Sequence, residues 1–274
     1  MSQQGSVPRS ATRRRRDHLL EVVRAGQVNI VELASRFHVS PSTIRRDLAA
    51  LAGEGRVMRT YGGAIGHDRA SEPSLRAKER QRAMEKDAIG RAAAQLVDHG
   101  DVVLLDAGTT VGRLAWHLRQ RDDITVVTNG LSSLLALHDA PRVEVILIGG
   151  RLRRPNEAFL GPETDQALRR FRPDIAFLGA DGLRPDRGLN CPSSEQAVTK
   201  EMMAASSRQA WVLADHHKLT TAPYPYWAPL DGDIGLVTDL DCPREALDPF
   251  VEAGWRVEVA AGEQLYELTV DPVG

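Results

Sequence analysis

The sequence predicts two domains, a small winged helix-turn-helix domain followed by a larger α/β domain built on a mostly parallel sheet. The length of 274 residues allows two domains of about 100–200 residues each. The first 70 residues hold 12 of the 35 basic residues and 6 of the 37 acidic ones, a net charge of +6, whereas the remainder carries −8. Beyond this basic segment, short apolar runs alternate with helical segments, which is typical of a parallel sheet covered on both faces.

Composition excludes several classes of protein. Hydrophobic residues make up 42% of the chain, enough for a packed core, and no apolar run approaches the roughly 18–20 residues that cross a bilayer. The first 20 residues contain arginines but no apolar stretch before a cleavage site, so we expect no secretory signal and no membrane association. Cys191 and Cys242 lack CxxC spacing, which fits a reducing cytoplasm.

Breaks in the pattern suggest four segments. We expect a flexible basic N-terminus over residues 1–12, a winged helix-turn-helix domain over 13–66, a linker over 67–85 and the α/β domain over 86–274. The charged stretch 71–99 has apolar residues at helical spacing after Pro73. It is equally well interpreted as a lever between the domains and as a solvated helix that transmits nothing.

The basic domain begins with three predicted helices. Apolar residues recur at helical spacing over 19–23 and again over 30–37. Ser40-Pro41 then opens a third helix, because serine caps helix N-termini and proline is tolerated at the first helical position. The buried stripe of this helix is predicted to be Ile44, Leu48 and Leu51. Two short helices joined by a tight turn, with arginines near the start of the second, are typical of helix-turn-helix proteins.

We expect this domain to bind double-stranded DNA. The third helix would enter the major groove, and its polar N-terminal turn would reach phosphates and base edges. Residues 55–65 are predicted to form a hairpin wing near the flanking backbone. The alternative is a three-helix scaffold whose arginines are merely solvated. The candidate DNA-binding residues are Ser40, Ser42, Thr43, Arg45, Arg46, Arg59, Thr60 and Tyr61.

In the larger domain, strands are predicted over 102–106, 124–128, 143–149, 175–180, 210–215, 236–238 and 256–259. Helices are predicted near 110–120, 131–138, 163–171, 194–206 and 244–253. Ligands of such sheets bind beyond the carboxyl ends of the strands. There, Asp106 is followed by Gly108, Thr109 and Thr110, a glycine turn with hydroxyls at a helix start that suits an anion. The turn lacks the P-loop and GxGxxG patterns, so a nucleotide phosphate is poorly supported.

Polar or glycine-rich residues follow four other predicted strands. They are Thr128-Asn129-Gly130, Gly149-Gly150, Gly179-Ala180-Asp181-Gly182 and Asp215-His216-His217-Lys218. Converging on one edge, they would offer a lysine for phosphate and Asp or Asn groups for hydroxyls, which suits a small phosphorylated sugar or polyol. Taken singly, each is better interpreted as an ordinary turn, whereas the set together favours a ligand site. Two adjacent histidines without a third ligand do not predict a metal, and we expect no cofactor.

At Val39-Ser-Pro-Ser-Thr-Ile-Arg-Arg-Asp-Leu48, with Gly62-Gly-Ala64, the chain resembles the DeoR family of bacterial transcriptional regulators. The resemblance covers nearly all of the chain beyond the first dozen residues. It implies a winged helix-turn-helix followed, over 86–274, by a sugar-phosphate-sensing effector domain similar to ribose-5-phosphate isomerase. Further matching motifs include Gly161-Pro162, Glu195 and Lys200.

The resemblance assigns roles within the effector domain. It implies that Gly108, Thr109, Thr110 and Lys218 hold a phosphate. The sugar would face Asp106, Asn129, Asp181 and Glu195, with Gly149 and Gly150 lining the same edge. The chain departs from the family at His217 and Leu219, which flank the lysine.

The resulting hypothesis is a cytoplasmic transcriptional regulator, most simply a repressor of carbohydrate-utilisation genes, whose operator affinity a phosphorylated sugar modulates. Symmetric operators call for a homodimer or a higher homo-oligomer. The rival is a sugar-phosphate isomerase-like enzyme with an added DNA-binding domain, in which Asp106, Asp181, Glu195 and Lys218 would shuttle protons. A third alternative is a nucleoid-type protein that binds DNA without regard to sequence.

Overall fold

The computed structural model describes residues 15–19, 22–23, 28–53, 57–60, 63–66, 72–261 and 264–267. Contacts divide the chain into two compact units, Met1–Glu72 and Pro73–Gly274. The predicted linker 67–85 therefore straddles the boundary, and its second half belongs to the larger unit. The predicted flexible segment 1–12 lies outside the described residues.

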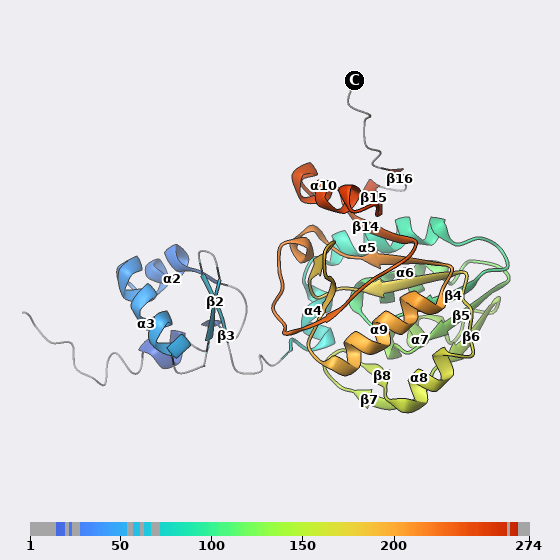
Figure 1. The fold of residues 1–274 in the computed structure, drawn as a ribbon, viewed down its shortest axis with the longest axis horizontal. Coiled ribbons are helices and arrows are strands. Elements are labelled where there is room, and N and C mark those ends of the chain that lie inside the picture. Colours follow the sequence, from blue (N-terminus) through green and yellow to red (C-terminus); the bar gives the residue numbers. More distant parts are fainter. Residues whose placement is uncertain are drawn as a thin grey trace, which may run out of the picture. The chain divides into compact units, whose positions relative to one another are not determined.

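Helices and short strands of the smaller unit are labelled in Figure 1, and the helices pack around one apolar cluster. Residues 15–19 and 22–23 are helical. They precede β1 (Val28–Asn29), α2 (Ile30–Arg36), α3 (Pro41–Gly53), β2 (Val57–Thr60) and β3 (Gly63–Gly66). Leu19, Leu33, Ile44, Leu48 and Leu51 are buried together, as the helical spacing predicts. β2 and β3 pair antiparallel as a wing, with Thr60 opposite Gly63, and β1 pairs with β3.

The larger unit is built on one eight-stranded sheet in the order β16-β15-β14-β12-β9-β4-β5-β6. Its strands are β4 (Val102–Leu105), β5 (Ile124–Thr128), β6 (Val143–Leu147), β9 (Ile175–Gly179), β12 (Gln209–Leu213), β14 (Ile234–Asp239), β15 (Arg256–Ala261) and β16 (Gln264–Glu267). Seven of them are parallel, and β16 alone pairs antiparallel, with β15. The seven parallel strands correspond to the predicted ones, whereas β16 lies beyond the last predicted strand.

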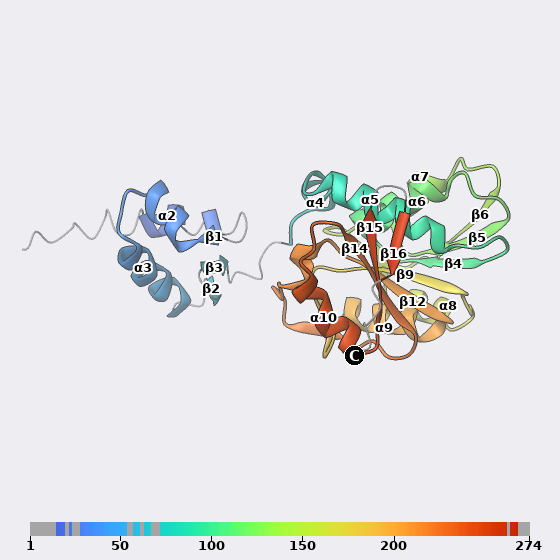
Figure 2. The ribbon, with the colours of Figure 1, turned by 90° about the horizontal axis from the view of Figure 1, so that it is seen from above.

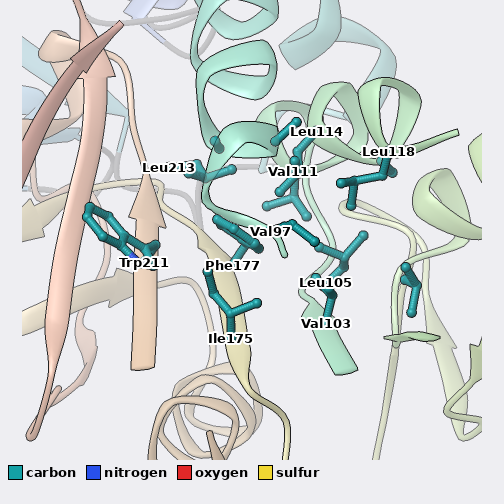
Figure 3. Packing of buried hydrophobic residues seen from close by; sticks show 14 of the residues in the cluster. Val97, Val103, Leu105, Val111, Leu114, Leu118, Ile175, Phe177, Trp211 and Leu213 are labelled. Carbon is teal, nitrogen blue, oxygen red and sulfur yellow. The ribbon is translucent and has the colours of Figure 1, made fainter. Parts of the chain in front are cut away.

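Helices cover both faces of this sheet (Figure 2). On one face lie α5 (Ala83–Ala93), α6 (Thr109–Leu118) and α7 (Leu131–Leu137), and on the other α8 (Pro162–Leu168), α9 (Ser194–Ser206) and α10 (Arg244–Glu252). Alternate residues of β4 enter different clusters, because strand side chains point to opposite faces. Val103 and Leu105 join Phe177 and Trp211 under α5–α7 (Figure 3), whereas Leu104 joins the cluster under α8–α10.

Several smaller elements follow the carboxyl ends of the strands. They are the hairpin β7 (Arg151–Arg153) and β8 (Ala158–Leu160), the three-stranded sheet β10 (Leu183–Arg184), β11 (Gly188–Cys191) and β13 (Tyr226–Ala228), and the 3-10 helix η2 (His216–Leu219). A second 3-10 helix, η1 (Ala94–Leu96), follows α5 and precedes β4. The charged stretch 71–99 contains α4 (Leu75–Arg80), α5 and η1. Among the described residues, no helix is long and apolar enough to span a membrane. Neither Cys191 nor Cys242, both of which the structure describes, is part of a disulfide bond.

The order in which the chain adds strands to the sheet reverses between β4 and β9, although these two strands run parallel. From β4 it adds β5 and β6 outward on one side, then returns to place β9, β12, β14 and β15 on the other. In open parallel sheets, ligands bind at such a switch point, outside the carboxyl ends of the strands. The strand order therefore places Asp106, after β4, and Gly179, at the end of β9, at the position where a ligand is expected.

Candidate functional site: a recognition helix and a strand-end ion cluster

The third helix of the smaller unit presents a polar face. Ser42, Arg45 and Arg46 are exposed on α3, while Ile44 and Leu48 on its opposite side are buried. Ser40 caps the helix, since its Oγ accepts a hydrogen bond from the backbone N–H of Thr43 at 3.2 Å. The Ser40 hydroxyl also lies 2.8 Å from that of Ser42 and 2.9 Å from that of Thr43. These five predicted DNA-binding residues share one helix end.

The predicted wing contacts are only partly visible. Arg59 and Thr60 lie in β2. Their side chains, and the whole of Tyr61, lie outside the described residues.

A buried aspartate organises the inner side of the same helix. The side chain of Asp47 on α3 is 3% exposed and receives two arginines, Arg15 Nε at 2.8 Å and Arg16 Nε at 2.9 Å. These two members of the N-terminal arginine run therefore hold the first helical segment against α3. Sequence reasoning treated the run only as a source of positive charge, and the buried Asp47 could not be paired with it from spacing alone.

At the switch point of the larger unit, Asp106 and Lys200 form a buried ion pair. The Asp106 carboxylate accepts hydrogen bonds from Lys200 Nζ, on α9, and from the backbone N–H of Gly179 at 3.1 Å. Lys200 Nζ also donates to the carbonyl of Gly179 at 2.7 Å. Burial alone would lower the pKa of Lys200, but the Asp106 carboxylate outweighs it and raises that pKa. The pair ties the ends of β4 and β9 to α9.

The glycine-threonine turn opens α6 beside this pair. Gly108 occupies the N-cap position, without a side-chain cap, and its carbonyl accepts from the N–H of Gly112 at 2.8 Å. Thr109 is half-buried and Thr110 is buried in the first turn. The N-terminus of a ten-residue helix thus opens at the switch point, where backbone N–H groups and the helix dipole favour an anion.

Asn129, which follows β5, has one satisfied and one unsatisfied end. It is fully buried and its Nδ2 donates to the carbonyl of Phe159 at 3.2 Å. Its Oδ1 is also buried, and within the described residues it has no hydrogen-bond partner. A buried acceptor without a donor is costly unless another molecule supplies one.

Two further acidic residues of the strand ends are paired with α4 and the turn after it. Lys78 Nζ lies 2.6 Å from Asp181 Oδ1, and Arg82 Nε lies 3.4 Å from Asp215 Oδ1. Burial alone would raise the pKa of Asp181, but the ammonium groups of Lys78 and Lys218 outweigh it and lower that pKa. Lys218 is half-buried in η2, and its side-chain ammonium has no hydrogen bond or ion pair within the described part of the chain.

Lys86, on α5, adds a third cation near this edge. It is 5% exposed, and its ammonium donates to the backbone carbonyls of Lys78 and of Gln81, the latter at 2.7 Å. Burial, with the positive charge of Lys218, lowers the pKa of Lys86 to about 8. Lys86 therefore binds backbone carbonyl oxygens at the C-terminal end of α4.

The remaining predicted effector residues lie apart from these contacts. Glu195 pairs with Arg151 at 2.7 Å; the Arg151 side chain is largely exposed, whereas that of Glu195 is partly buried. Lys200 lies five positions after Glu195, which rotates the two side chains about 140° apart around α9. Gly149 and Gly150 are exposed, and the carbonyl of Gly149 accepts from the Thr164 hydroxyl at 2.7 Å.

His216 and His217, which follow β12, contact an aspartate and each other. His216 Nδ1 lies 2.6 Å from Asp239 Oδ2, and the two imidazole rings of His216 and His217 are 3.9 Å apart. No group of three or more His, Cys, Asp or Glu side chains in the described part of the chain could hold a metal ion.

Sequence reasoning missed Lys78, Arg82 and Lys86, and it noted Lys200 without choosing it as a site residue. The missed residues lie in the stretch that was interpreted as a linker or lever. A usable signal was present at Lys86: a lysine followed at helical spacing by the apolar Ile89 and Ala93 lies on the buried side of the helix.

Two family models match the chain. The DeoR C terminal sensor domain matches residues 81–239, and the DeoR-like helix-turn-helix domain matches residues 15–70.

Curated relatives match along most of their length. The chain is 35% identical to the HTH-type transcriptional regulator YgbI of Escherichia coli K12, over 91% of this chain and 98% of that protein. It is 35% identical to the transcriptional repressor AccR of Agrobacterium fabrum, over 84% and 90%. It is 33% identical to the HTH-type transcriptional repressor GlcR of Bacillus subtilis, over 78% and 82%. These relatives are transcriptional regulators and not enzymes.

Among solved structures, ribose 5-phosphate isomerase A of Methanocaldococcus jannaschii aligns with 68% of this chain and 98% of its own. The TM-score is 0.39 and the sequence identity 13%, so we draw nothing about ligand or reaction from this likeness.

Proposed function

Since the chain belongs to the DeoR family of helix-turn-helix transcriptional regulators, we propose that it represses carbohydrate-utilisation genes in the cytoplasm and that a phosphorylated sugar modulates its operator affinity. The single observation that supports operator binding best is the exposed polar end of α3. Arg45 and Arg46 project from it and form no hydrogen bond or ion pair within the described residues. Cations of this kind are matched to phosphates and guanine edges.

The effector proposal rests on groups that lack partners at the strand ends. Lys218 offers an ammonium, the N-terminus of α6 offers backbone N–H groups and Asn129 Oδ1 offers a buried acceptor. A phosphate ester with free hydroxyls would supply the matching chemistry, since its phosphate is anionic and its hydroxyls donate hydrogen bonds. The relatives AccR and GlcR are both named as transcriptional repressors, which supports the direction of regulation.

We propose that the operator-bound form is a homodimer or a higher homo-oligomer. Helix-turn-helix proteins read two half-sites about one helical turn apart, which requires two recognition helices. Sedimentation of the full chain, free and on operator DNA, would test this directly. A single chain bound to each operator would contradict the proposal.

The test of function is fluorescence anisotropy of the full chain on DNA from its own upstream region, at stated salt, with scrambled DNA as the control. The titration is repeated with ribose 5-phosphate, fructose 1-phosphate, glucose 6-phosphate and glycerol 3-phosphate, and with the unphosphorylated parents. Sequence-specific binding that one phosphorylated compound shifts is the expected result. Equal affinity for both DNAs would support the sequence-blind DNA binder, and isomerisation of any of these compounds would support the enzyme.

A variant assigns the phosphate contact. Lys218→Gln is expected to preserve operator binding and to weaken the effector response about tenfold, because a charge-assisted contact to phosphate is lost. Arg76→Gln, at an exposed position of α4, is the matched loss of one positive charge. An unchanged dose response in Lys218→Gln would remove Lys218 from the site.

A further inference from the structure

The first helix of the larger unit is anchored to the strand ends where the effector is proposed to bind. α4 begins three residues after Glu72, the last residue of the smaller unit. Ser74 caps its start, and Leu75 is buried. From its last turn, Lys78 reaches Asp181, with side chains 15% and 18% exposed. An ion pair this far removed from water is worth more than a surface pair.

The turn that follows α4 is fixed in the same way. Arg82 adopts a left-handed backbone conformation, with φ of 53°, between α4 and α5. This conformation is unfavourable for a residue with a Cβ atom, so surrounding contacts must maintain it. The guanidinium of Arg82 lies 3.4 Å from the buried carboxylate of Asp215, and Lys86 binds the carbonyls of Lys78 and Gln81. α4 and its turn therefore depend on charges at the strand ends.

We propose that Lys78, Arg82, Asp181 and Asp215, here called the α4 clasp, transmit effector binding to the DNA-binding unit. The inference rests on the proposed function and adds its route. Asp181 follows β9 and Asp215 follows β12, so each clasp carboxylate lies at a strand end, the edge of the sheet that a ligand approaches. A hydroxyl that binds Asp181 competes with Lys78, so effector binding opens the clasp and frees α4.

This route satisfies the requirement that the ligand distinguish two states. A ligand shifts an equilibrium only by its differential affinity for the two states. With the clasp closed, Asp181 is occupied by Lys78. With the clasp open, Asp181 is available to the ligand. The chain passes from the DNA-binding unit to the larger unit between Glu72 and Pro73, and α4 is the first helix after this boundary.

The test compares Lys78→Gln, which breaks the clasp, with Lys78→Arg, which preserves its charge. Arg80→Gln removes one charge from an exposed position of the same helix and is the matched control. For each full-length variant, operator affinity is measured with and without glucose 6-phosphate, or whichever of the four sugar phosphates shifts the wild type. Calorimetry of the same proteins measures the affinity for that compound.

The wild type and Arg80→Gln are expected to change operator affinity about tenfold on adding the compound. Lys78→Gln is expected to show less than about a twofold change, with its operator affinity fixed at the effector-bound value of the wild type. Its affinity for the sugar phosphate should equal or exceed that of the wild type, because Lys78 no longer competes for Asp181. Lys78→Arg should restore the change.

Three results would overturn the inference. A full response in Lys78→Gln would show that the clasp does not carry the coupling. Loss of sugar-phosphate binding in Lys78→Gln would make Lys78 a ligand contact instead. A wild type that binds operator but responds to none of the four compounds would remove the effector proposal and the clasp with it, whereas failure to bind operator at all would contradict the proposed function first.

A folding defect is separated from loss of coupling by two measurements. Thermal unfolding of Lys78→Gln should still show one cooperative transition with a midpoint above the assay temperature, because losing one largely buried ion pair lowers the free energy of unfolding without unfolding the domain. Arg82→Gln breaks the second half of the clasp and should reproduce the loss of response. If Arg82→Gln responds like the wild type while Lys78→Gln does not, the clasp as defined is wrong.

Discussion

The charged side chains of α3 and those at the strand ends of the larger unit differ in whether they have partners within the chain. On α3, Arg45 and Arg46 are exposed and without partners among the described residues. At the strand ends, Asp106, Asp181 and Asp215 are each paired with a cation of the same chain. An arginine without a partner costs nothing in water and is available to DNA phosphates. A paired carboxylate instead forces a ligand to compete with an existing contact, which is what a regulated site requires.

The largest expected effect breaks the most deeply buried pair. Lys200→Met leaves the Asp106 carboxylate buried without its cation, so we expect the larger unit to lose about 3–5 kcal/mol in free energy of unfolding. Urea unfolding followed by circular dichroism measures this loss. The control is Lys218→Met, which removes a lysine without an ion pair and should change stability by less than about 0.5 kcal/mol. Equal losses in both variants would contradict the contrast between the two lysines.

On α3 we expect substitutions to weaken operator binding and to leave stability nearly unchanged. Arg45→Ala or Arg46→Ala should cost about 1–3 kcal/mol in operator binding if a base contact is lost, with little change in unfolding. Anisotropy at several salt concentrations separates the two kinds of contact, because losing only a phosphate contact weakens binding to all sequences and reduces the salt slope. Arg76→Ala in the larger unit serves as the control. Unchanged operator binding in both variants would mean that α3 is not the reading helix.

The sequence predicts the exposed face of α3 better than the ion pairs at the strand ends, because the first depends on local spacing and the second on contacts between distant residues. The exposed face of α3 follows from spacing within ten residues, since Ser40-Pro41 and the stripe of Ile44 and Leu48 set which side chains face water. The seven parallel strands were also predicted, because each strand is a local apolar run. The pairing of Asp106 with Lys200 joins residues 94 apart. It depends on strand order, which local periodicity does not contain.

The predicted linker shows the same limit. Residues 75–82 have few apolar side chains, so their pattern indicates a solvated segment. What fixes them is the contact of Lys78 and Arg82 with acids that follow distant strands. Family resemblance singled out Asp181 as facing a ligand, but gave no reason to pair it with Lys78.

A third variant sharpens the comparison, because the recognition helix also has one paired charge. Asp47→Ala removes the acceptor of Arg15 and Arg16, so we expect the smaller unit to lose about 1–2 kcal/mol in free energy of unfolding. Operator affinity should fall only as far as the unit unfolds, and recover at lower temperature. Asp17→Ala, nearby and exposed, is the control. A loss of operator affinity without any loss of stability would instead make Asp47 a direct determinant of DNA binding.

The last expected effect is a pH dependence of stability at Lys86, which is small over any single pH unit. Its pKa is about 8 in the folded protein, against 10.5 for an ordinary lysine side chain in water, so between these values the unfolded chain binds more protons than the folded one. Stability contributed by this group therefore rises with pH across that window, by at most about 1.4 kcal/mol per pH unit. Lys86→Met cannot titrate and keeps a similar volume. Urea unfolding of both proteins from pH 7 to pH 10 should show the wild type gaining stability relative to Lys86→Met as pH rises, because the buried ammonium is then neutralised. A constant difference across that range would mean that Lys86 keeps an ordinary pKa, and that the carbonyls of Lys78 and Gln81 compensate fully for its burial.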